Sequence, residues 1–361
     1  MAEVQNIPEV CNELKLSVLV PVYNTGALLE PCLKSLAAQT VQNIEYICIN
    51  DGSTDGSDEI LNEWSKCDAR FQVIHQPNGG YGKAMNVALK AAKGTWIGIV
   101  EPDDWVEPTM FQHLLELAEQ TTAPIVKGSF TGERVGKRKP SGKFASHLPG
   151  TEIKPTEAID YITGSVAIWS AIYKREWLIK NNICFSETPG ASFQDLGFAL
   201  RTWIAADSIC VTPAAAYHYK EDNPSSSSRK LDEGAWAVLR ELELQTEIFE
   251  SIPTEATLKR SMLVRRILHS LQADYRIRIS SKVDEYLISY SNFLNKCFPL
   301  HTLCKEPFKK QEWHDLQLLY HTPLKYPRKR RGNVSLAQRI FSCRREGGRK
   351  VLRLFGLTYR F

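Results

Sequence analysis

The sequence predicts an α/β fold with a mostly parallel sheet and flanking helices, followed by an α-helical C-terminal region. Within the first hundred residues, four apolar runs typical of buried strands alternate with stretches whose apolar residues recur at helical spacing. This βαβαβαβ order requires parallel strands joined by right-handed crossovers. From about residue 230 the apolar spacing is helical throughout, so a second, helical region is expected there.

Each strand prediction rests on an apolar run that ends at a turn. The intervening helices are expected to bury apolar faces that include Leu33, Leu61 and Ala88. The strands are expected at residues 16–22, 44–49, 71–75 and 96–100.

Beyond the fourth strand the pattern is less regular. Residues 132–143, rich in Gly, Lys and Arg, are expected to form a loop, and a helix is expected over 196–204. Long helices are expected over 231–252, 258–277 and 282–298. The chain is therefore divided into residues 1–230, 231–324 and 325–361.

The composition is that of an ordinary soluble globular protein, with 361 residues of which 43% are hydrophobic and 24% charged. No apolar run has the length of a transmembrane helix, and the N-terminus has no secretory pattern. The nine cysteines are scattered without a zinc-ligand spacing, which favours reduced thiols. A cytoplasmic protein is expected.

Charge is distributed unevenly along the chain. Residues 325–361 hold 12 Lys and Arg and one acid, a net charge of +11, whereas residues 1–324 hold 33 basic and 40 acidic residues, a net −7. In this tail the cluster at 328–331 resembles a nucleic-acid-binding or nuclear-targeting run, but apolar residues interleave with the later arginines. This pattern favours peripheral binding to an anionic membrane surface over nucleic acid. A solvated surface or an oligomer contact is the alternative.

Two adjacent carboxylates, Asp103 and Asp104, follow the fourth predicted strand. Ligands of open α/β sheets bind at the carboxyl ends of strands. Neighbouring carboxylates repel each other unless a cation lies between them and a phosphate. The pair therefore predicts a metal–diphosphate site, and the alternative is the N-cap of a following helix.

Four motifs in fixed order resemble family 2 glycosyltransferases of the GT-A fold. Residues 20–24 (VPVYN), 49–55 (INDGSTD), 78–86 (NGGYGKAMN) and 101–104 (EPDD) carry the resemblance. It covers roughly residues 14–230 and leaves 231–361 unsupported. It implies a GT-A-like fold, a nucleotide-diphosphate sugar as donor (a UDP-sugar first), Mn²⁺ or Mg²⁺, and inversion at the anomeric carbon.

On the donor side, the resemblance implies that Pro21 and Tyr23 lie at the nucleotide base and that Asp51 accepts a hydrogen bond from it. It also implies that the Gly80 backbone and Lys83 face the diphosphate, that Asp104 binds the metal, and that Asp103 lies near the sugar or ribose hydroxyls. The alternatives are a core aromatic at Tyr23, a turn residue at Asp51 and a solvated helix lysine at Lys83.

On the acceptor side, Asp195 matches the family's catalytic base, which takes the acceptor's hydroxyl proton, and Gln194 replaces the usual Glu. A helix N-cap is the other role open to Asp195. Trp169 and Tyr173 match an acceptor-facing aromatic stretch, with core packing as the alternative. Lys220 and Ser226 are expected in a lid over the diphosphate, and His218 is expected at the metal or in a structural role.

The sequence thus predicts a metal-dependent inverting glycosyltransferase of surface-glycan assembly, acting on a glycan or lipid-linked acceptor hydroxyl at the inner face of the membrane. A sugar nucleotidyltransferase would need a basic, Gly-rich loop after the first strand, and Tyr23–Gly26 contains no basic residue. A non-catalytic sugar-binding protein is the other alternative. Such a protein would be a transferase domain that has lost its catalytic residues, and the retention of Asp51, Asp104 and Asp195 argues against it.

Overall fold

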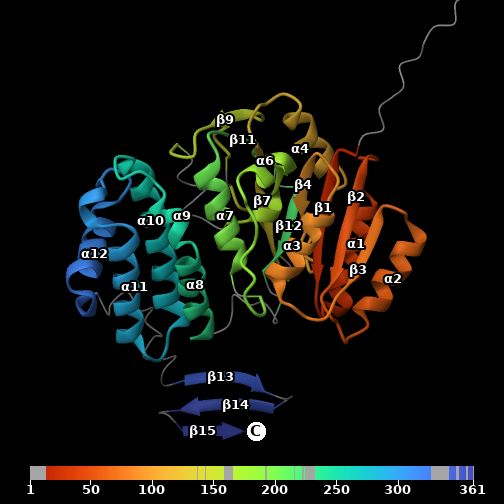
Figure 1. Ribbon diagram of the computed structural model, residues 1–361. Helices are drawn as coiled ribbons and strands as arrows, with labels where there is room; N and C mark the ends of the chain where they lie inside the picture. The colour runs from red at the N-terminus through yellow and green to blue at the C-terminus, as the bar shows by residue number, and fades with distance from the viewer. Residues whose placement is uncertain are drawn as a thin grey trace, which may run out of the picture.

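The computed structural model describes residues 14–326 except 136, 143, 158–165, 192, 215, 222 and 224–231, together with the backbone of 341–346, 349–354 and 357–360. Figure 1 shows a mixed α/β part that holds the N-terminal half of the chain and, beside it, a bundle of helices from the C-terminal half. The predicted fold class is confirmed.

The α/β part is built on an eight-stranded sheet with the order β3-β2-β1-β4-β10-β6-β11-β9. The first four strands are parallel, as predicted, whereas β10 runs antiparallel to both of its neighbours. Every residue of β1 and β2 is buried, because helices cover both faces of the sheet. The strands are β1 (Leu16–Val22), β2 (Ile44–Asn50), β3 (Phe71–His75), β4 (Trp96–Ile99), β6 (Ile125–Lys127), β9 (Thr151–Ile153), β10 (Ala171–Lys174) and β11 (Ile209–Val211).

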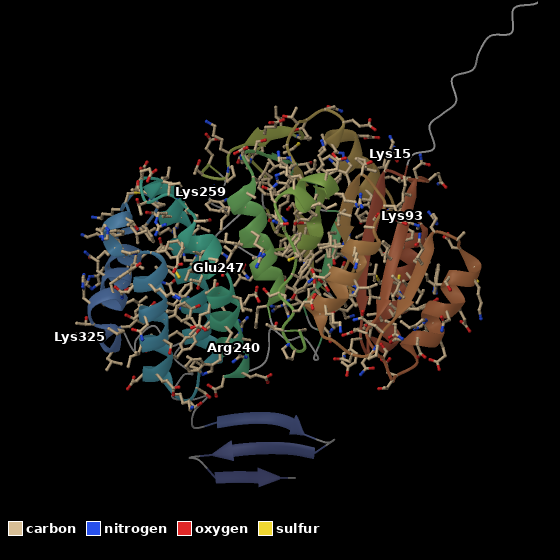
Figure 2. All side chains as sticks on the ribbon, viewed as in Figure 1. Lys15, Lys93, Arg240, Glu247, Lys259 and Lys325 are labelled. Carbon is tan, nitrogen blue, oxygen red and sulfur yellow. The ribbon has the colours of Figure 1, made fainter. Side chains whose placement is uncertain are left out.

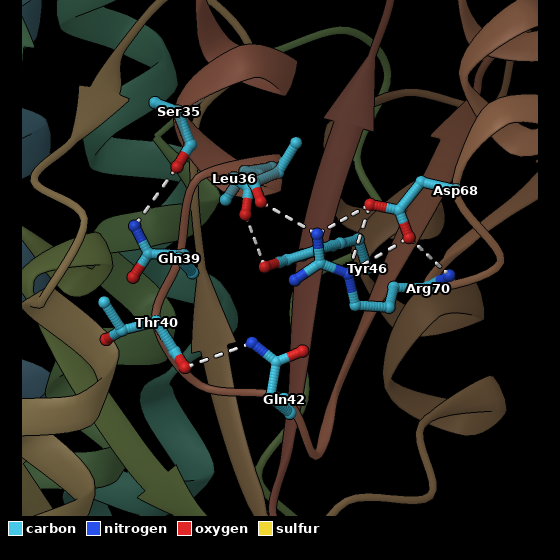
Figure 3. Close-up of polar contacts among 9 residues, drawn as sticks. Ser35, Leu36, Gln39, Thr40, Gln42, Tyr46, Asp68 and Arg70 are labelled. Carbon is cyan, nitrogen blue, oxygen red and sulfur yellow. Dashed lines mark hydrogen bonds and ion pairs between the residues drawn. The ribbon is translucent and has the colours of Figure 1, made fainter.

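The helices of this part pack through apolar faces, as in α1, which buries Leu29, Cys32, Leu33 and Leu36 at helical spacing. Polar contacts fix the end of α1 against the sheet. The Tyr46 hydroxyl on β2 donates to the Leu36 carbonyl (2.5 Å), beside the Arg70–Asp68 ion pair (Figure 3). The helices are α1 (Leu29–Ala37), α2 (Ser57–Cys67), α3 (Tyr81–Ala91), α4 (Met110–Ala118), α6 (Arg175–Lys180) and α7 (Gln194–Ala205).

The strand order reverses between β1 and β4. From β1 the chain moves outward to β2 and β3, and it then returns to the other side of β1 as β4. The β1–β4 pairing covers only Leu16 to Leu19, whereas β1 pairs with β2 along its whole length. The carboxyl ends of β1 and β4 therefore diverge, which is where open α/β sheets bind ligands.

A second sheet, in the order β5-β12-β7-β8, lies next to this divergence. Its strands are β5 (Trp105–Val106), β7 (Phe130–Arg134), β8 (Lys137–Pro140) and β12 (Tyr217–Lys220). The prediction of a loop over 132–143 was wrong, because β7 and β8 pair as a hairpin. Pairing of β5 with β12 brings residues 217–220 against the chain that follows Asp104.

The C-terminal region consists of helices packed on α7. The predicted helix over 231–252 is interrupted at Gln245, and α12 had no counterpart in the prediction. Lys259, labelled in Figure 2, joins the two parts by donating from Nζ to the Ile204 carbonyl in α7 (2.6 Å). The helices are α8 (Glu233–Leu244), α9 (Thr246–Glu250), α10 (Thr257–Ala273), α11 (Val283–Cys297) and α12 (Lys310–His321), with a π-helical turn at Asp274–Arg278.

The predicted basic tail contains a three-stranded antiparallel sheet of β13 (Phe341–Glu346), β14 (Arg349–Leu354) and β15 (Leu357–Arg360). The basic cluster at 328–331 lies outside the described residues, as does the predicted domain boundary near residue 230.

Seven cysteines of the described region are free, and four of them, Cys32, Cys48, Cys210 and Cys297, are buried. Cys67 and Cys184 are exposed. Within the part of the chain that the structure describes, no helix has both the length and the apolar character needed to cross a membrane.

Candidate active site

Asp104 is buried between β4 and β5, directly before β5, and is held by the second sheet. Its Oδ2 accepts a hydrogen bond from the Tyr217 hydroxyl (2.8 Å), and its Oδ1 accepts one from the backbone N–H of Lys220 (2.7 Å). Burial, and then the charge of Asp103, raises the pKa of Asp104. Asp104 is not a helix cap, because α4 begins six residues later with Thr109 as its N-cap.

Asp103 is more open than Asp104, and its Oδ2 accepts a hydrogen bond from Asn223 Nδ2 (2.6 Å). Glu101, two residues earlier, accepts from the Tyr81 hydroxyl (2.7 Å). Burial raises the pKa of Glu101 to about 8, and the charges of Asp103 and Asp104 add to this effect. Three carboxyl groups within four residues thus form an electrostatically strained cluster.

This cluster fits a divalent cation. Within the described residues, no Lys or Arg forms an ion pair with Glu101, Asp103 or Asp104. The same part of the chain contains no group of three or more His, Cys, Asp or Glu arranged to hold a metal ion alone. A small hard cation bound by one or two carboxylates takes its other oxygen ligands from substrate phosphates and water.

The exposed ring of Tyr23 lies just beyond β1. Tyr23 is 54% exposed, which is unusual for a tyrosine at the end of a buried strand, so the alternative of a core aromatic is wrong. Pro21 is buried in β1, two residues beyond Leu19, the last residue of β1 that pairs with β4. A proline fits there because no backbone N–H is needed to pair with β4. An exposed aromatic ring at the carboxyl end of β1 is suited to stacking on a nucleotide base.

Asp51 organises the glycine-rich loop. Its Oδ1 accepts hydrogen bonds from Gln76 Nε2 (2.7 Å) and the Gly79 N–H (2.9 Å), and its Oδ2 accepts one from the Gly80 N–H (2.9 Å). The carboxylate is 3% exposed. Only Oδ2 retains a lone pair beyond these bonds, so the predicted contact of Asp51 with the base stays a prediction.

The prediction that the Gly80 backbone faces a diphosphate was wrong. The Gly80 N–H is bound to Asp51, and the Tyr81 N–H donates to the Gly190 carbonyl (3.1 Å). Gly80 has φ +87°, and a Cβ there would lie 2.8 Å from backbone atoms of Thr188 and Gly190. The loop uses glycine to pack against another segment. Lys83 is exposed, and its side chain lies over Gly79.

That other segment is residues 185–191, which we call the strap. Asn86 on α3 donates from Nδ2 to the Phe185 carbonyl (2.9 Å) and accepts from its N–H (2.9 Å). Gln194 Nε2 donates to Thr188 Oγ1 (2.8 Å) and to the Gly190 carbonyl (3.1 Å). Gln194 is 1% exposed, so it holds the strap from inside the protein and does not face an acceptor as predicted.

Asp195 lies in the first turn of α7. The N-cap is Phe193, which has φ +65°, so the alternative that Asp195 caps the helix is wrong. The preceding residue, Gln194, binds the Gly190 carbonyl of the strap, which also accepts the Tyr81 N–H, and the Tyr81 hydroxyl binds Glu101. These contacts connect the start of α7 with the acidic cluster. Burial raises the pKa of Asp195, whereas the N–H of Leu196 and the charges of Arg266 and Arg278 oppose the rise.

His218 does not fit a metal ligand. Its Nδ1 lies 3.0 Å from Glu133 and its Nε2 2.8 Å from Glu107, so both ring nitrogens already have carboxylate partners. Its ring stacks on Trp105 (3.5 Å between centroids). The structure therefore favours the structural role. Lys220 contributes its backbone N–H to Asp104, and Ser226, the other predicted lid residue, lies outside the described residues.

Trp169 and Tyr173 were predicted to face the acceptor, but both pack in the core. Trp169 is 7% exposed and stacks on Tyr217 (4.0 Å between centroids), which in turn binds Asp104. Tyr173 is fully buried, and its hydroxyl donates to the Ile168 carbonyl (2.9 Å). Trp169 thus supports the acidic cluster indirectly, by packing against the tyrosine that binds Asp104.

Several residues around the site had not been predicted. Tyr81 lies inside the motif at residues 78–86, which was the available signal. Tyr217, Asn223 and Arg278 had no such signal, because only the tertiary fold brings them to Asp104, Asp103 and Phe193, respectively.

Comparisons with known proteins agree with this architecture. Residues 17–180 match Glycosyl transferase family 2. The chain is 37% identical over 216 residues to EpsJ, an uncharacterised glycosyltransferase of Bacillus subtilis, a match covering 58% of this chain and 62% of EpsJ. It is 32% identical over 232 residues to the glycosyltransferase GlyG of Streptococcus pneumoniae, covering 60% of this chain and 74% of GlyG.

Among solved structures, residues 1–349 of TarS from S. aureus in complex with UDP-GlcNAc superimpose with a TM-score of 0.70 at 18% identity. This superposition covers 96% of the present chain and 99% of the TarS chain, so it includes the helical region as well as the α/β part. The shared fold is GT-A. Taken with the similarity to GlyG over most of that protein, it shows that this chain belongs to glycosyltransferase family 2.

Proposed function

We propose that this protein transfers a sugar from a nucleotide diphosphate to an acceptor hydroxyl with inversion at the anomeric carbon, in assembly of a bacterial surface glycan. The observation that supports the proposal is that Asp195 lies in the first turn of α7, which contacts through the strap and Tyr81 connect with the acidic cluster. One side of the site suits a cation and a diphosphate, and the other presents a single carboxylate to an acceptor.

A UDP-sugar is the donor we propose first. The TarS structure that shares this fold was solved with UDP-GlcNAc. In the present chain, Tyr23 offers an exposed ring for the base, and Asp103 is more exposed than its neighbour Asp104. The acceptor is a glycan or a lipid-linked glycan, in keeping with the basic tail described below.

Asp103 and Asp104 are the residues that would hold Mn²⁺ or Mg²⁺. The cation would neutralise the charge that develops on the departing diphosphate. The chain itself positions these carboxylates, through Tyr217 and Lys220 for Asp104 and through Asn223 for Asp103.

In the proposed reaction, the Asp195 carboxylate takes the proton of the acceptor hydroxyl as its oxygen attacks the anomeric carbon. The bond from that carbon to the diphosphate oxygen breaks, and its electron pair leaves with the nucleoside diphosphate. Attack from the face opposite the leaving group inverts the configuration. Because burial raises the pKa of Asp195, the carboxylate is a stronger base than an exposed aspartate.

A panel of nucleotide sugars tests the proposal directly. Release of nucleoside diphosphate should occur with one donor, most readily with a UDP-sugar, and should stop when EDTA removes divalent cations. NMR of the product should show an anomeric configuration opposite to that of the donor. Turnover that is insensitive to EDTA would contradict the proposed requirement for a divalent cation. Retention of the anomeric configuration would contradict the proposed role of Asp195 as general base.

A further inference from the structure

The helical region also holds the strap. α8 lies beside α7 (Figure 1), and Glu241 on α8 reaches the strap, where its Oε1 accepts a hydrogen bond from Ser186 Oγ (2.9 Å). The same oxygen accepts one from Gln245 Nε2 (2.8 Å), which also donates to Ser186 Oγ (3.1 Å). These three side chains, which we call the latch, therefore join α8 to the strap by three mutual hydrogen bonds.

A glycine of α7 makes room for the latch. A Cβ at Gly197 would lie 1.8 Å from Glu241 Oε1 and 2.7 Å from Gln245 Nε2. Arg201, one turn further along α7, donates from Nε to Gln245 Oε1 (2.7 Å). The two helices thus interlock directly after Asp195, and a larger side chain at position 197 would displace the Glu241 carboxyl group.

Glu241 is an acid in surroundings that disfavour a charge. It is 2% exposed, and its Oε2 is buried without a hydrogen-bond partner among the described residues. Burial raises the pKa of Glu241 to about 7, against the hydrogen bonds from Ser186 and Gln245; the charge of Asp195 adds to the rise and that of Arg201 opposes it. An apolar side chain would avoid this cost. The hydrogen bonds that Glu241 accepts are therefore the reason we assign to its presence.

Ser186 connects the latch with the donor side of the site. Its carbonyl oxygen would lie 1.9 Å from a Cβ at Gly82, so the strap and α3 are in backbone contact there. Further along the strap, the Gly190 carbonyl accepts the Tyr81 N–H at the start of α3 (3.1 Å). Because the strap then leads into α7, a side chain that fixes Ser186 also restrains the segment between α3 and the first turn of α7.

We propose that Glu241 of the helical region is a positioning residue for the transfer reaction: by holding Ser186, it keeps the strap seated between α3 and α7 and so fixes Asp195 relative to the donor side. The inference rests on the proposed function. It gives the helical region a part in the reaction without requiring that Glu241 touch a substrate.

Hydrogen exchange tests the latch without any activity. Glu241→Ala removes the acceptor that holds Ser186. The N–H groups of Phe185 and Tyr81, which bind between the strap and α3, should then exchange roughly 10–100-fold faster, as expected for the loss of one or two hydrogen bonds. This acceleration should exceed that of the N–H groups of β1, which report global unfolding. Glu241→Gln keeps a carbonyl oxygen at the same place and should retain the protection of the wild type.

Kinetics test the consequence for the reaction. Glu241→Ala should lower kcat by up to about 10²-fold, the usual cost of a small misplacement of a catalytic group. The KM for the donor should change little, because the proposed donor contacts at Tyr23 and Asp104 belong to other elements. Glu241→Gln should restore kcat.

Glu312→Ala is the matched control. Glu312 is a partly buried acid of the same helical region, and its partners Arg265 and His269 also belong to that region. Its loss should change neither the exchange of the Phe185 and Tyr81 N–H groups nor kcat.

Three results would overturn the proposal. The first is exchange at Phe185 and Tyr81 that Glu241→Ala leaves unchanged or accelerates no more than at β1. The second is a loss of kcat that Glu241→Gln does not restore. The third is an equal loss of kcat in Glu312→Ala, which would show that Glu241 only stabilises the fold. If the wild type transfers no sugar but the exchange changes as expected, the proposed function fails while the latch stands.

Discussion

Asp103 and Asp104 are neighbours in the chain, yet the fold gives them different surroundings. Asp104 is 2% exposed and bound through both oxygens to the second sheet, whereas Asp103 is more open and bound through one oxygen to Asn223. Substitution at each position should therefore affect different properties, although both residues belong to the proposed cation site.

Asp103→Asn should remove the effect of Mn²⁺ on nucleotide binding while leaving the melting temperature near that of the wild type. The amide keeps the shape of the side chain but loses the charge that attracts the cation. Calorimetric titration of UDP with and without Mn²⁺ is the measurement. Metal-dependent affinity that persists in this variant would place the cation elsewhere.

Asp104→Ala should abolish transfer, remove the metal dependence of nucleotide binding, and also destabilise the protein. It leaves the Tyr217 hydroxyl and the Lys220 N–H without their buried acceptor, at a cost of about 1–3 kcal/mol for each unsatisfied group. Urea denaturation of this variant beside Asp103→Asn separates the two effects. Equal stability of the two variants would contradict the supporting role of the second sheet.

Asp195→Asn should leave donor binding nearly intact but lower kcat by roughly 10²–10⁴-fold, the usual contribution of a positioned general base. Asp207→Asn, at an exposed acid just after α7, is the control and should have normal kcat. Normal turnover with weakened donor affinity in Asp195→Asn would assign this residue to the donor side.

At the scale of elements, the strap links the donor and acceptor sides of the site. It lies against the N-terminus of α3 through Gly80 and Gly82, and it leads directly into α7. A Cβ at Gly82 would lie 1.9 Å from the Ser186 carbonyl oxygen, which belongs to backbone and cannot simply rotate away. Close packing of two backbone segments therefore explains this glycine.

Gly82→Ala should lower stability by about 1–3 kcal/mol, as overpacking does. The direction of the change in stability is informative, because a glycine-to-alanine substitution inside a helix otherwise stabilises a protein by up to about 1 kcal/mol. Gly79→Ala is the control, since the nearest atom there is the flexible Lys83 side chain. Thermal melts of both variants are the measurement, and a Gly82→Ala protein at least as stable as the wild type would show that the strap moves freely.

At the scale of the whole molecule, a basic tail follows an acidic body, and we expect this difference in charge to determine where the protein meets its acceptor. The described body ends at Tyr326, which is 1% exposed and packs on Tyr275, and the sheet β13–β15 follows. In its register Phe341 lies opposite Leu354, and Cys343 lies opposite Leu352. We propose that the tail binds the inner face of the membrane peripherally.

A protein truncated after Tyr326 tests the tail while keeping the core intact. The full-length protein should co-sediment with anionic vesicles, because each basic residue near such a surface contributes about 1 kcal/mol. The truncated protein should remain in the supernatant, and added salt should release the full-length protein. If both proteins sediment equally, or neither does, an oligomer or partner contact becomes the better interpretation of the tail.

The sequence by itself determined the parallel strands, their order along the chain and the three carboxylates Asp103, Asp104 and Asp195. These features are local: apolar runs report burial of a strand, and acids that follow a strand lie at the carboxyl edge of the sheet. Only the tertiary structure decided which neighbours those residues meet. Gln194 looks like an acceptor-facing residue in sequence, but it holds the strap from inside the protein, and only the structure shows that Asp51 holds the loop at Gly80.

The same limit applies to the helical region, whose apolar periodicity predicted helices but gave no sign of Arg278 over the ring of Phe193, 85 positions earlier in the sequence. Contacts between distant segments depend on how whole elements dock, and side-chain periodicity within one element carries no record of its partner. Burial then sets the pKa of each acid, because loss of hydration depends on what the docked elements exclude. The carboxylates of this site could therefore be predicted from the sequence. Their pKa values and the residues that hold them in place depend on the tertiary fold.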